Sequence, residues 1–214
     1  MTVMEYMELG NLRSNLTIKK YNPLDKYENL CQISESLLSL HKCNLVHDDF
    51  HSGNLLLIFQ KNAFISDLGL SKPADKPTVK SNEIYGVLPY IAPEVLRGKP
   101  YTKAADIYSF GIIMWEMTSG KPAFNNVPHD FNLSLNICQG LRPEIFEGKT
   151  PKIFDDTEKQ KVFEGTEIKY TKLMKRCWDS DPDKRPTAEE LYKNFRIWRF
   201  KFYIDERIPV PGKD

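Results

Sequence analysis

Residues 46–54 read Val46-His47-Asp48-Asp49-Phe50-His51-Ser52-Gly53-Asn54, and an apolar run, residues 55–59, follows at once. Asp49 lies five residues before Asn54, and Asp67 follows thirteen residues after Asn54. Phosphoryl transfer from a nucleotide needs an acidic acceptor that orients the attacking hydroxyl and hard oxygen ligands that hold Mg²⁺ on the phosphates. Asp49 suits the first role, and Asn54 and Asp67 suit the second. The plainer interpretation of the pattern is a polar turn before a β hairpin.

This segment resembles the catalytic loop H-R-D-L-x-x-x-N of protein kinases, and Asp67-Leu68-Gly69 resembles their D-F-G motif. The resemblance extends over roughly residues 1 to 200 and implies a mainly α (α+β) fold, the large C-terminal lobe of a kinase with a small β hairpin. It places the hinge and the end of the small lobe in residues 1–12, the large lobe in residues 13–200 and a tail in residues 201–214. It implies ATP and Mg²⁺ as cofactors, with Asp49, Asn54 and Asp67 as catalytic residues and the last two as metal ligands.

The nucleotide-binding residues also follow from the resemblance. The stretch from Val3 to Leu12 is similar to a kinase hinge, in which the backbone of Glu5 and Met7 would hydrogen-bond the adenine ring. Leu56 would lie under that ring. A protein substrate and a nucleotide are therefore the expected partners.

Apolar periodicity and capping residues predict five helices. They are expected from Pro23 to about Cys43, Thr102 to Gly120, Asp130 to Gln139, Glu167 to Trp178, and after a capping box of Thr187 and Glu190. Two short strands, residues 55–59 and 63–65, are expected to form a hairpin with Asn54 and Asp67 at its bases, so that both could reach one metal ion. Residues 142–166 are expected to be irregular, and the chain after Tyr203 to be frayed.

Two charged residues are expected to be buried in structural roles. Asp106 lies in the helix expected at 102–120, which is apolar on every side and therefore typical of a buried helix. A buried carboxylate needs partners, and by resemblance Asp106 accepts backbone N–H groups of the His47 loop. Ala92-Pro93-Glu94 and Arg185-Pro186 resemble two further kinase motifs, so we expect a mostly buried ion pair between Glu94 and Arg185.

Composition excludes several classes of protein. The 214 residues carry 30 Lys plus Arg against 29 Asp plus Glu, a net charge of +1, which argues against a nucleic acid or a membrane surface as the main partner. The four cysteines form no C-x-x-C pair, which favours a reducing, cytoplasmic setting. No apolar run approaches the roughly 20 residues that span a bilayer, and no signal peptide is visible.

The sequence also departs from the kinase pattern. It contains no G-x-G-x-x-G loop and no strand lysine of the V-A-I-K type before the hinge. We therefore expect the chain to be truncated and inactive alone, with an open cleft that a small lobe or a partner would cover.

Asp48 stands where most kinases have an arginine that pairs with an activation-segment phosphate. Thr78, Ser81 and Tyr85 are the hydroxyls of that segment (67–94) that could be phosphorylated.

Two further substitutions, His51 for the usual lysine and Val87 for the usual threonine, leave the choice between Ser/Thr and Tyr acceptors open. The pattern from Gly86 to Tyr90 is most similar to the tyrosine-kinase-like group, whose members mostly phosphorylate serine or threonine. Two alternatives to a protein kinase are a non-catalytic pseudokinase or protein-binding module, and a small-molecule phosphotransferase. The motifs around Glu94 and Arg185 argue against the last, because they support a peptide-binding segment.

Overall fold

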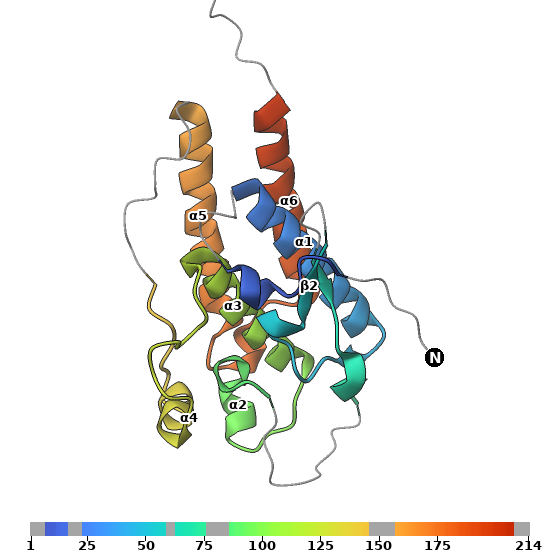
Figure 1. Cartoon of the computed structure of the whole chain (residues 1–214), viewed down its shortest axis with the longest axis vertical. Coiled ribbons are helices and arrows are strands. Elements are labelled where there is room, and N and C mark those ends of the chain that lie inside the picture. The colour runs from blue at the N-terminus through green and yellow to red at the C-terminus, as the bar shows by residue number, and fades with distance from the viewer. Residues whose placement is uncertain (1–6, 17–22, 59–62, 76–85, 146–156, 208–214) are drawn as a thin grey trace, which may run out of the picture.

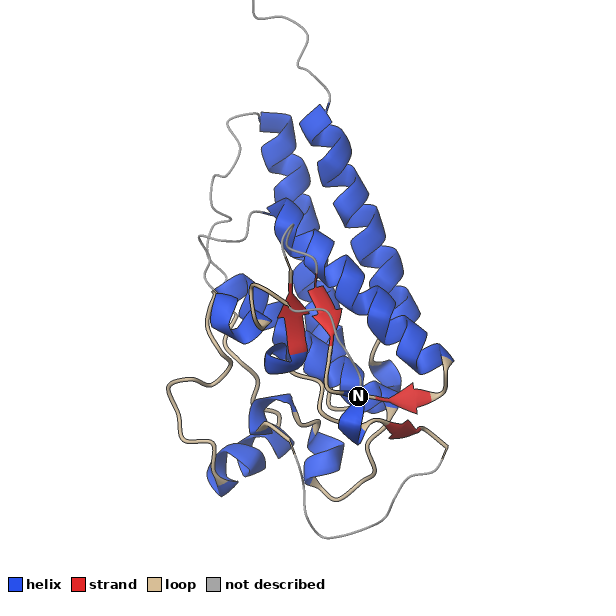
Figure 2. Cartoon of the chain, turned by 45° about the vertical axis from the view of Figure 1, so that its right-hand side comes forward, coloured by secondary structure: helices blue, strands red, loops and turns tan. Residues whose placement is uncertain are grey.

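The computed structural model describes residues 7–16, 23–58, 63–75, 86–145 and 157–207, and helices dominate this part of the chain (Figures 1 and 2). The long helices are α1 (Pro23–Lys42), α3 (Lys103–Ser119), α5 (Thr157–Cys177) and α6 (Ala188–Arg207), and the short ones are α2 (Pro93–Leu96) and α4 (Phe131–Cys138). Figure 1 shows α5 and α6 extending from the same end of the molecule, with α1 beside α6. The prediction of a mainly α fold with a small hairpin is confirmed.

Helix α3 forms the centre of the core, as its apolar surface predicts. Several of its side chains are fully buried, among them Phe110, Ile112 and Ile113. The Thr102 hydroxyl caps the helix by accepting the N–H of Ala105 at 3.3 Å, and Gly120 ends it in a left-handed conformation. Helix α5 approaches so closely that a Cβ atom at Gly111 would lie 2.7 Å from the Cβ of Cys177. The predicted extent and burial of this helix are confirmed.

Two small antiparallel sheets complete the fold. β2 (Leu55–Leu57) and β3 (Ala63–Ile65) form the predicted hairpin, although β2 ends before the predicted Phe59, and residues 59–62 lie outside the described part. β1 (Leu45–Val46) pairs with β4 (Lys72–Pro73) in a second sheet that sequence analysis does not predict. Strands of two residues are too short to show an alternating pattern.

Two predictions about the C-terminal half are wrong in part, and residues 146–156 and 208–214 lie outside the described part. Residues 142–166 are expected to be irregular, whereas α5 already begins at Thr157, before the predicted Glu167. Residues 157–166 show no apolar period, but they are rich in Glu, Lys and Gln, which favour a helix. The chain after Tyr203 is expected to be frayed, whereas α6 continues to Arg207.

The predicted starts of α4 and α6 are confirmed. The Thr187 N–H donates to Glu190 Oε2 at 2.9 Å, and the Glu190 N–H donates to Thr187 Oγ1 at 3.2 Å, which is the expected capping box of α6. The Asp130 carboxylate accepts two backbone N–H groups at the start of α4. Among the described helices, none is long and apolar enough to cross a membrane.

Candidate active site

The loop of residues 47–54, between β1 and β2, is anchored by Asp106 of α3. The buried Asp106 carboxylate accepts the backbone N–H of His47 at 2.9 Å and that of Asp48 at 3.3 Å. It also lies 2.9 Å from Nε2 of His41, in the last turn of α1. This contact with His41 is not predicted from the sequence. The predicted role of Asp106 as the anchor of the loop is confirmed.

His47 joins the loop to the segment that carries Asp67. Its side chain is fully buried, with Nε2 3.0 Å from the carbonyl oxygen of Ser66 and Nδ1 3.4 Å from the backbone nitrogen of Asp49. A carbonyl oxygen can only accept, so Nε2 carries the hydrogen, and Nδ1 accepts the Asp49 N–H. The imidazole is therefore neutral and serves as a rigid connector between the two segments.

Asn54 and His51 fix the carboxylate of Asp49. The Asn54 amide nitrogen donates to the backbone carbonyl of Asp49 at 3.0 Å and to its Oδ2 at 3.2 Å. His51 accepts the Gly53 N–H at Nδ1 (2.9 Å), so its Nε2 carries the hydrogen and faces Asp49 Oδ2 at 3.5 Å. Burial lowers the pKa of His51, in keeping with a neutral ring. The structure thus brings Asp49 and Asn54 together, and leaves the Asn54 Oδ1 atom free of these bonds for a metal ion.

Asp67 stands at the other base of the hairpin. It is exposed, adopts a left-handed conformation (φ 56°) and makes no side-chain hydrogen bond to the following 3₁₀ helix η5 (Leu68–Leu70). Its neighbour Ser66 ties it to Asn54, since the Ser66 N–H and Oγ–H both donate to the Asn54 carbonyl, at 2.9 and 3.0 Å. A direct contact between the Asp67 and Asn54 side chains is not formed in the described structure.

The donor set at the hairpin bases fits Mg²⁺. One carboxylate, from Asp67, and one amide oxygen, from Asn54, are hard ligands, and Mg²⁺ in nucleotide sites is held by one or two carboxylates together with phosphate oxygens. The described residues contain no cluster of three or more His, Cys, Asp or Glu side chains that could hold a metal by themselves. Asn54 and Asp67 would therefore bind the ion jointly with a nucleotide, and the ion would neutralise charge on the phosphates.

Leu56 has the orientation expected of a side chain that would lie under an adenine ring. Its neighbours Leu55 and Leu57 are buried in the core, whereas Leu56 is half-buried. Because side chains alternate along a strand, Leu56 lies on the outer face of the hairpin, opposite the exposed Phe64 of β3. This outer face offers apolar support to a flat ring.

The N-terminal segment runs along the free edge of β2, opposite β3. The Leu57 N–H donates to the Gly10 carbonyl at 2.8 Å, and the Leu9 N–H donates to the Leu57 carbonyl at 3.2 Å. Met7 begins the described part of this segment, and its carbonyl accepts the Gly10 N–H at 3.0 Å. Glu5, the other predicted adenine-binding residue, lies outside the described residues.

A buried carboxylate that sequence analysis misses orders the side of the site away from the hairpin. Glu116 of α3 has no exposed surface, accepts the Tyr90 hydroxyl at 2.7 Å and accepts the Ala123 N–H at 2.8 Å. Since Tyr90 donates to Glu116, its hydroxyl oxygen accepts from Ser52 Oγ (2.8 Å), which lies in the loop of residues 47–54. Burial raises the pKa of Glu116. The same argument that identified Asp106, a carboxylate in an apolar helix, could have identified Glu116.

Gly86 lets the chain pass close to Asp49. A Cβ atom there would lie 3.4 Å from Asp49 Oδ1, and the backbone has φ 114°, which side chains rarely adopt. A small hollow beside Asp49 is lined by Gly86, Val87 and Tyr101, among others. The Oδ1 atom, which Asn54 does not hold, therefore lies next to Gly86, and Asp49 itself lines the hollow.

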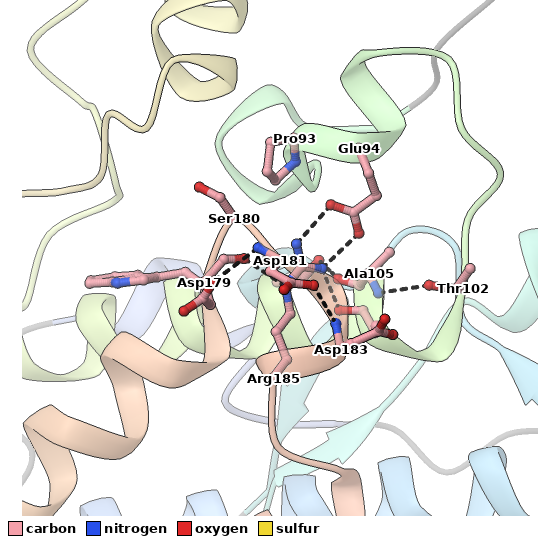
Figure 3. A network of polar contacts seen from close by, with 12 residues as sticks. Pro93, Glu94, Thr102, Ala105, Asp179, Ser180, Asp181, Asp183 and Arg185 are labelled. Carbon is pink, nitrogen blue, oxygen red and sulfur yellow. Dashed lines mark hydrogen bonds and ion pairs between the residues drawn. The ribbon is translucent and has the colours of Figure 1, made fainter.

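The predicted pair of Glu94 and Arg185 is confirmed (Figure 3). Two guanidinium nitrogens of Arg185 donate to the two carboxylate oxygens of Glu94, both at 2.7 Å, and the Arg185 side chain has no exposed surface. Arg185 also donates to the carbonyls of Asp179 and Ala104, each at 2.9 Å. The pair therefore joins α2 to the turn before α6 and to the start of α3.

Asp48 has a partner that the sequence does not indicate. Its Oδ2 lies 2.5 Å from Nζ of Lys72 in β4, and the Lys72 ammonium also lies over the ring of Tyr101, 5.2 Å from its centre. The other oxygen, Oδ1, is buried with no hydrogen-bond partner among the described residues. Burial raises the pKa of Asp48, and Lys72 opposes that rise.

A mainly α fold with this loop, hairpin and buried Glu–Arg pair is typical of the protein kinase class. The family model of the protein kinase domain matches residues 1–195, and the chain belongs to this family. Among the curated relatives, the probable serine/threonine-protein kinase drkC of Dictyostelium discoideum is 33% identical over 201 residues, which cover 89% of this chain and 24% of that protein. A second probable serine/threonine-protein kinase of that organism is 31% identical over 204 residues, covering 88% of this chain and 11% of that protein.

A protein of Acanthamoeba polyphaga mimivirus, named as a serine/threonine-protein kinase/receptor, is 31% identical over 191 residues, which cover 88% of this chain and 10% of that protein. The chain thus spans between a tenth and a quarter of the length of these relatives.

Proposed function

We propose that this domain transfers the γ-phosphate of ATP to serine or threonine hydroxyls of proteins. The observation that carries the proposal is the geometry around Asp49: Asn54 holds one carboxylate oxygen (3.2 Å), the other lies beside Gly86, and Asp49 lines the hollow there. Asp49 would orient the acceptor hydroxyl, and Asn54 and Asp67 would hold Mg²⁺ on the phosphates. Serine/threonine kinases among the relatives support this choice of acceptor.

The nucleotide would lie against the outer face of the hairpin. Leu56 would support the adenine ring, and the backbone of Glu5 and Met7 would hydrogen-bond its edge. The pattern from Gly86 to Tyr90 favours the tyrosine-kinase-like group of the family. The four cysteines are free, which supports a reducing, cytoplasmic setting.

We further propose that residues 1–214 alone transfer phosphate very poorly. Within them no glycine-rich loop excludes water from the phosphates, and no strand lysine neutralises the α- and β-phosphates. Catalysis of this reaction consists mainly of positioning and electrostatic stabilisation in a dry site. Losing about 4 kcal/mol of that stabilisation slows the step roughly a thousandfold.

Exposed apolar side chains beside the hairpin support a covering partner, which we propose to be a kinase small lobe or a protein in its place. Leu9, Phe64, Leu68 and Leu70 are 38, 41, 54 and 51% exposed. Exposed apolar side chains of this kind favour association.

The test combines ATP binding with a sensitive transfer assay. Purified residues 1–214 are titrated with ATP in Mg²⁺ and in a chelator, and are then incubated with radiolabelled ATP, Mg²⁺ and serine-, threonine- or tyrosine-containing acceptors. We expect Mg²⁺ to strengthen ATP binding in the wild type but not in Asp67→Asn, and a slow transfer to serine or threonine that Asp49→Asn abolishes.

Two outcomes contradict these proposals. A chain that binds Mg²⁺-ATP but shows no transfer dependent on Asp49 supports the pseudokinase alternative. Turnover on the order of 1 s⁻¹, typical of slow kinases, that vanishes in Asp49→Asn would show that these residues suffice without a partner.

A further inference from the structure

The segment that carries Asp67 buries little of its own surface. Leu68 and Leu70 of η5 are 54 and 51% exposed, and Asp67 itself has a left-handed backbone, a conformation that the surrounding structure must maintain. Upstream, β3 and Ser66 hold the segment to the hairpin. Its position therefore depends on what holds it downstream.

The downstream anchor is β4, at Lys72. Lys72 pairs with Val46 in the two-stranded sheet, and the Ala74 N–H donates to the Asn44 carbonyl at 2.8 Å. The sheet has only two residues per strand, so its backbone bonds contribute little by themselves. The ion pair of Lys72 Nζ and Asp48 Oδ2, at 2.5 Å, is the one charged contact between β4 and the catalytic loop among the described residues.

The electrostatic surroundings make Lys72 important to the loop as well. Asp48, Asp49 and Asp106 lie close enough that the last two both disfavour the charged form of Asp48, as burial does. Lys72 is the cation that opposes them. Without it, repulsion would push Asp48 and the catalytic loop away from the neighbouring carboxylates.

We propose that Lys72 is a positioning residue: through its ion pair with Asp48 it holds the Asp67 segment in register with the catalytic loop. The inference rests on the proposed function in one respect, that the Asp67 carboxylate is needed for Mg²⁺. The tether consists of two side chains of this chain, so it acts without a covalently added phosphate.

The first test is amide hydrogen exchange of residues 1–214 without nucleotide. In Lys72→Met and in Asp48→Asn we expect the Ser71 and Ala74 amides to exchange on the order of tenfold faster, with the amides of α3 unchanged. Asn tolerates the positive φ of 72° at position 48, so Asp48→Asn removes the charge without adding strain. Lys72→Arg should keep the slow exchange, and Lys193→Met, in an exposed pair on α6, serves as the control.

Unchanged exchange at Ser71 and Ala74 in Lys72→Met, or equal acceleration throughout α3, would overturn the proposal. The second test is the factor by which Mg²⁺, compared with a chelator, strengthens ATP binding. This factor should fall in Lys72→Met and stay at its wild-type value in Lys72→Arg. If the exchange rates change while this factor does not, Lys72 tethers the segment without positioning Asp67, and the proposal fails. A wild-type chain whose ATP affinity ignores Mg²⁺ contradicts the proposed function instead, and the exchange rates then decide the tether alone.

Discussion

Replacing Glu94 with glutamine should destabilise the domain far more than a surface substitution does. Glutamine keeps one oxygen for Arg185, but its NH₂ group faces the second guanidinium N–H, so one donor loses its acceptor and the buried cation loses its countercharge. Breaking a buried ion pair on one side costs about 3–5 kcal/mol. Arg185 keeps the carbonyls of Asp179 and Ala104, which places the cost near the lower end, about 3 kcal/mol.

The assay is urea and thermal unfolding of residues 1–214. For a domain of this size, a loss of about 3 kcal/mol lowers the melting temperature by roughly 6–12 °C. Glu189→Gln is the matched control, because Glu189 pairs with Lys193 on the exposed surface of α6, where both side chains are more than half exposed (55 and 63%). Equal midpoints for Glu94→Gln and Glu189→Gln would refute the reasoning, since the Glu94 pair would then contribute no more than an exposed one.

Three further outcomes are expected. Glu116→Gln should leave the fold intact and become more stable relative to the wild type as pH rises above about 4.5. Burial raises the pKa of Glu116 in the folded state, so the wild type loses free energy of unfolding as pH rises through that folded-state pKa, whereas the uncharged amide loses none. A difference in unfolding midpoint between the two proteins that does not grow with pH would contradict this. Asp106→Asn should lower the free energy of unfolding by about 2–4 kcal/mol, since an amide cannot accept all three hydrogen bonds of the carboxylate. The backbone amides of His47 and Asp48 should also exchange faster with solvent. An unfolding midpoint equal to that of the wild type would count against this prediction. In an active longer protein, phosphatase treatment should change kinase activity little. Asp48 offers no hydrogen-bond donor to a phosphate on Thr78, Ser81 or Tyr85, which lie outside the described residues. A kinase activity that is lost on treatment, restored by phosphorylation and abolished in Asp48→Asn would show the opposite.

Sequence reasoning succeeds here where a residue type contradicts its surroundings. A carboxylate in an apolar helix needs partners, so the structural role of Asp106 could be predicted from its surroundings. The resemblance to kinases supplied the His47 loop as its partner and paired Glu94 with Arg185, while the contact of Asp106 with His41 was not predicted. Glu116 belongs to the same class, and only its position near the end of α3, beside polar residues, concealed it.

Lys72 could not be predicted in the same way. A lysine in a polar, turn-rich stretch is usually solvated, and its role depends on β1 and β4, whose pairing has no sequence signature at two residues per strand. The N-terminal half of α5 was missed for a related reason: residues 157–166 carry helix-forming side chains but no apolar stripe, and periodicity was the signal that located the other helices.

The buried charges of this domain are better explained by position than by stability. Replacing a buried ion pair by well-packed apolar residues often costs nothing or even stabilises a protein, so stability alone gives no reason to retain Asp106, Glu116 and Arg185. Each of them instead holds a segment of the candidate site to the helical core: Asp106 the loop of residues 47–54, Glu116 the segment around Tyr90, and Arg185 helix α2. Two of the three come from α3, the most buried of the described helices, so the loop around Asp49 is held directly to the centre of the core.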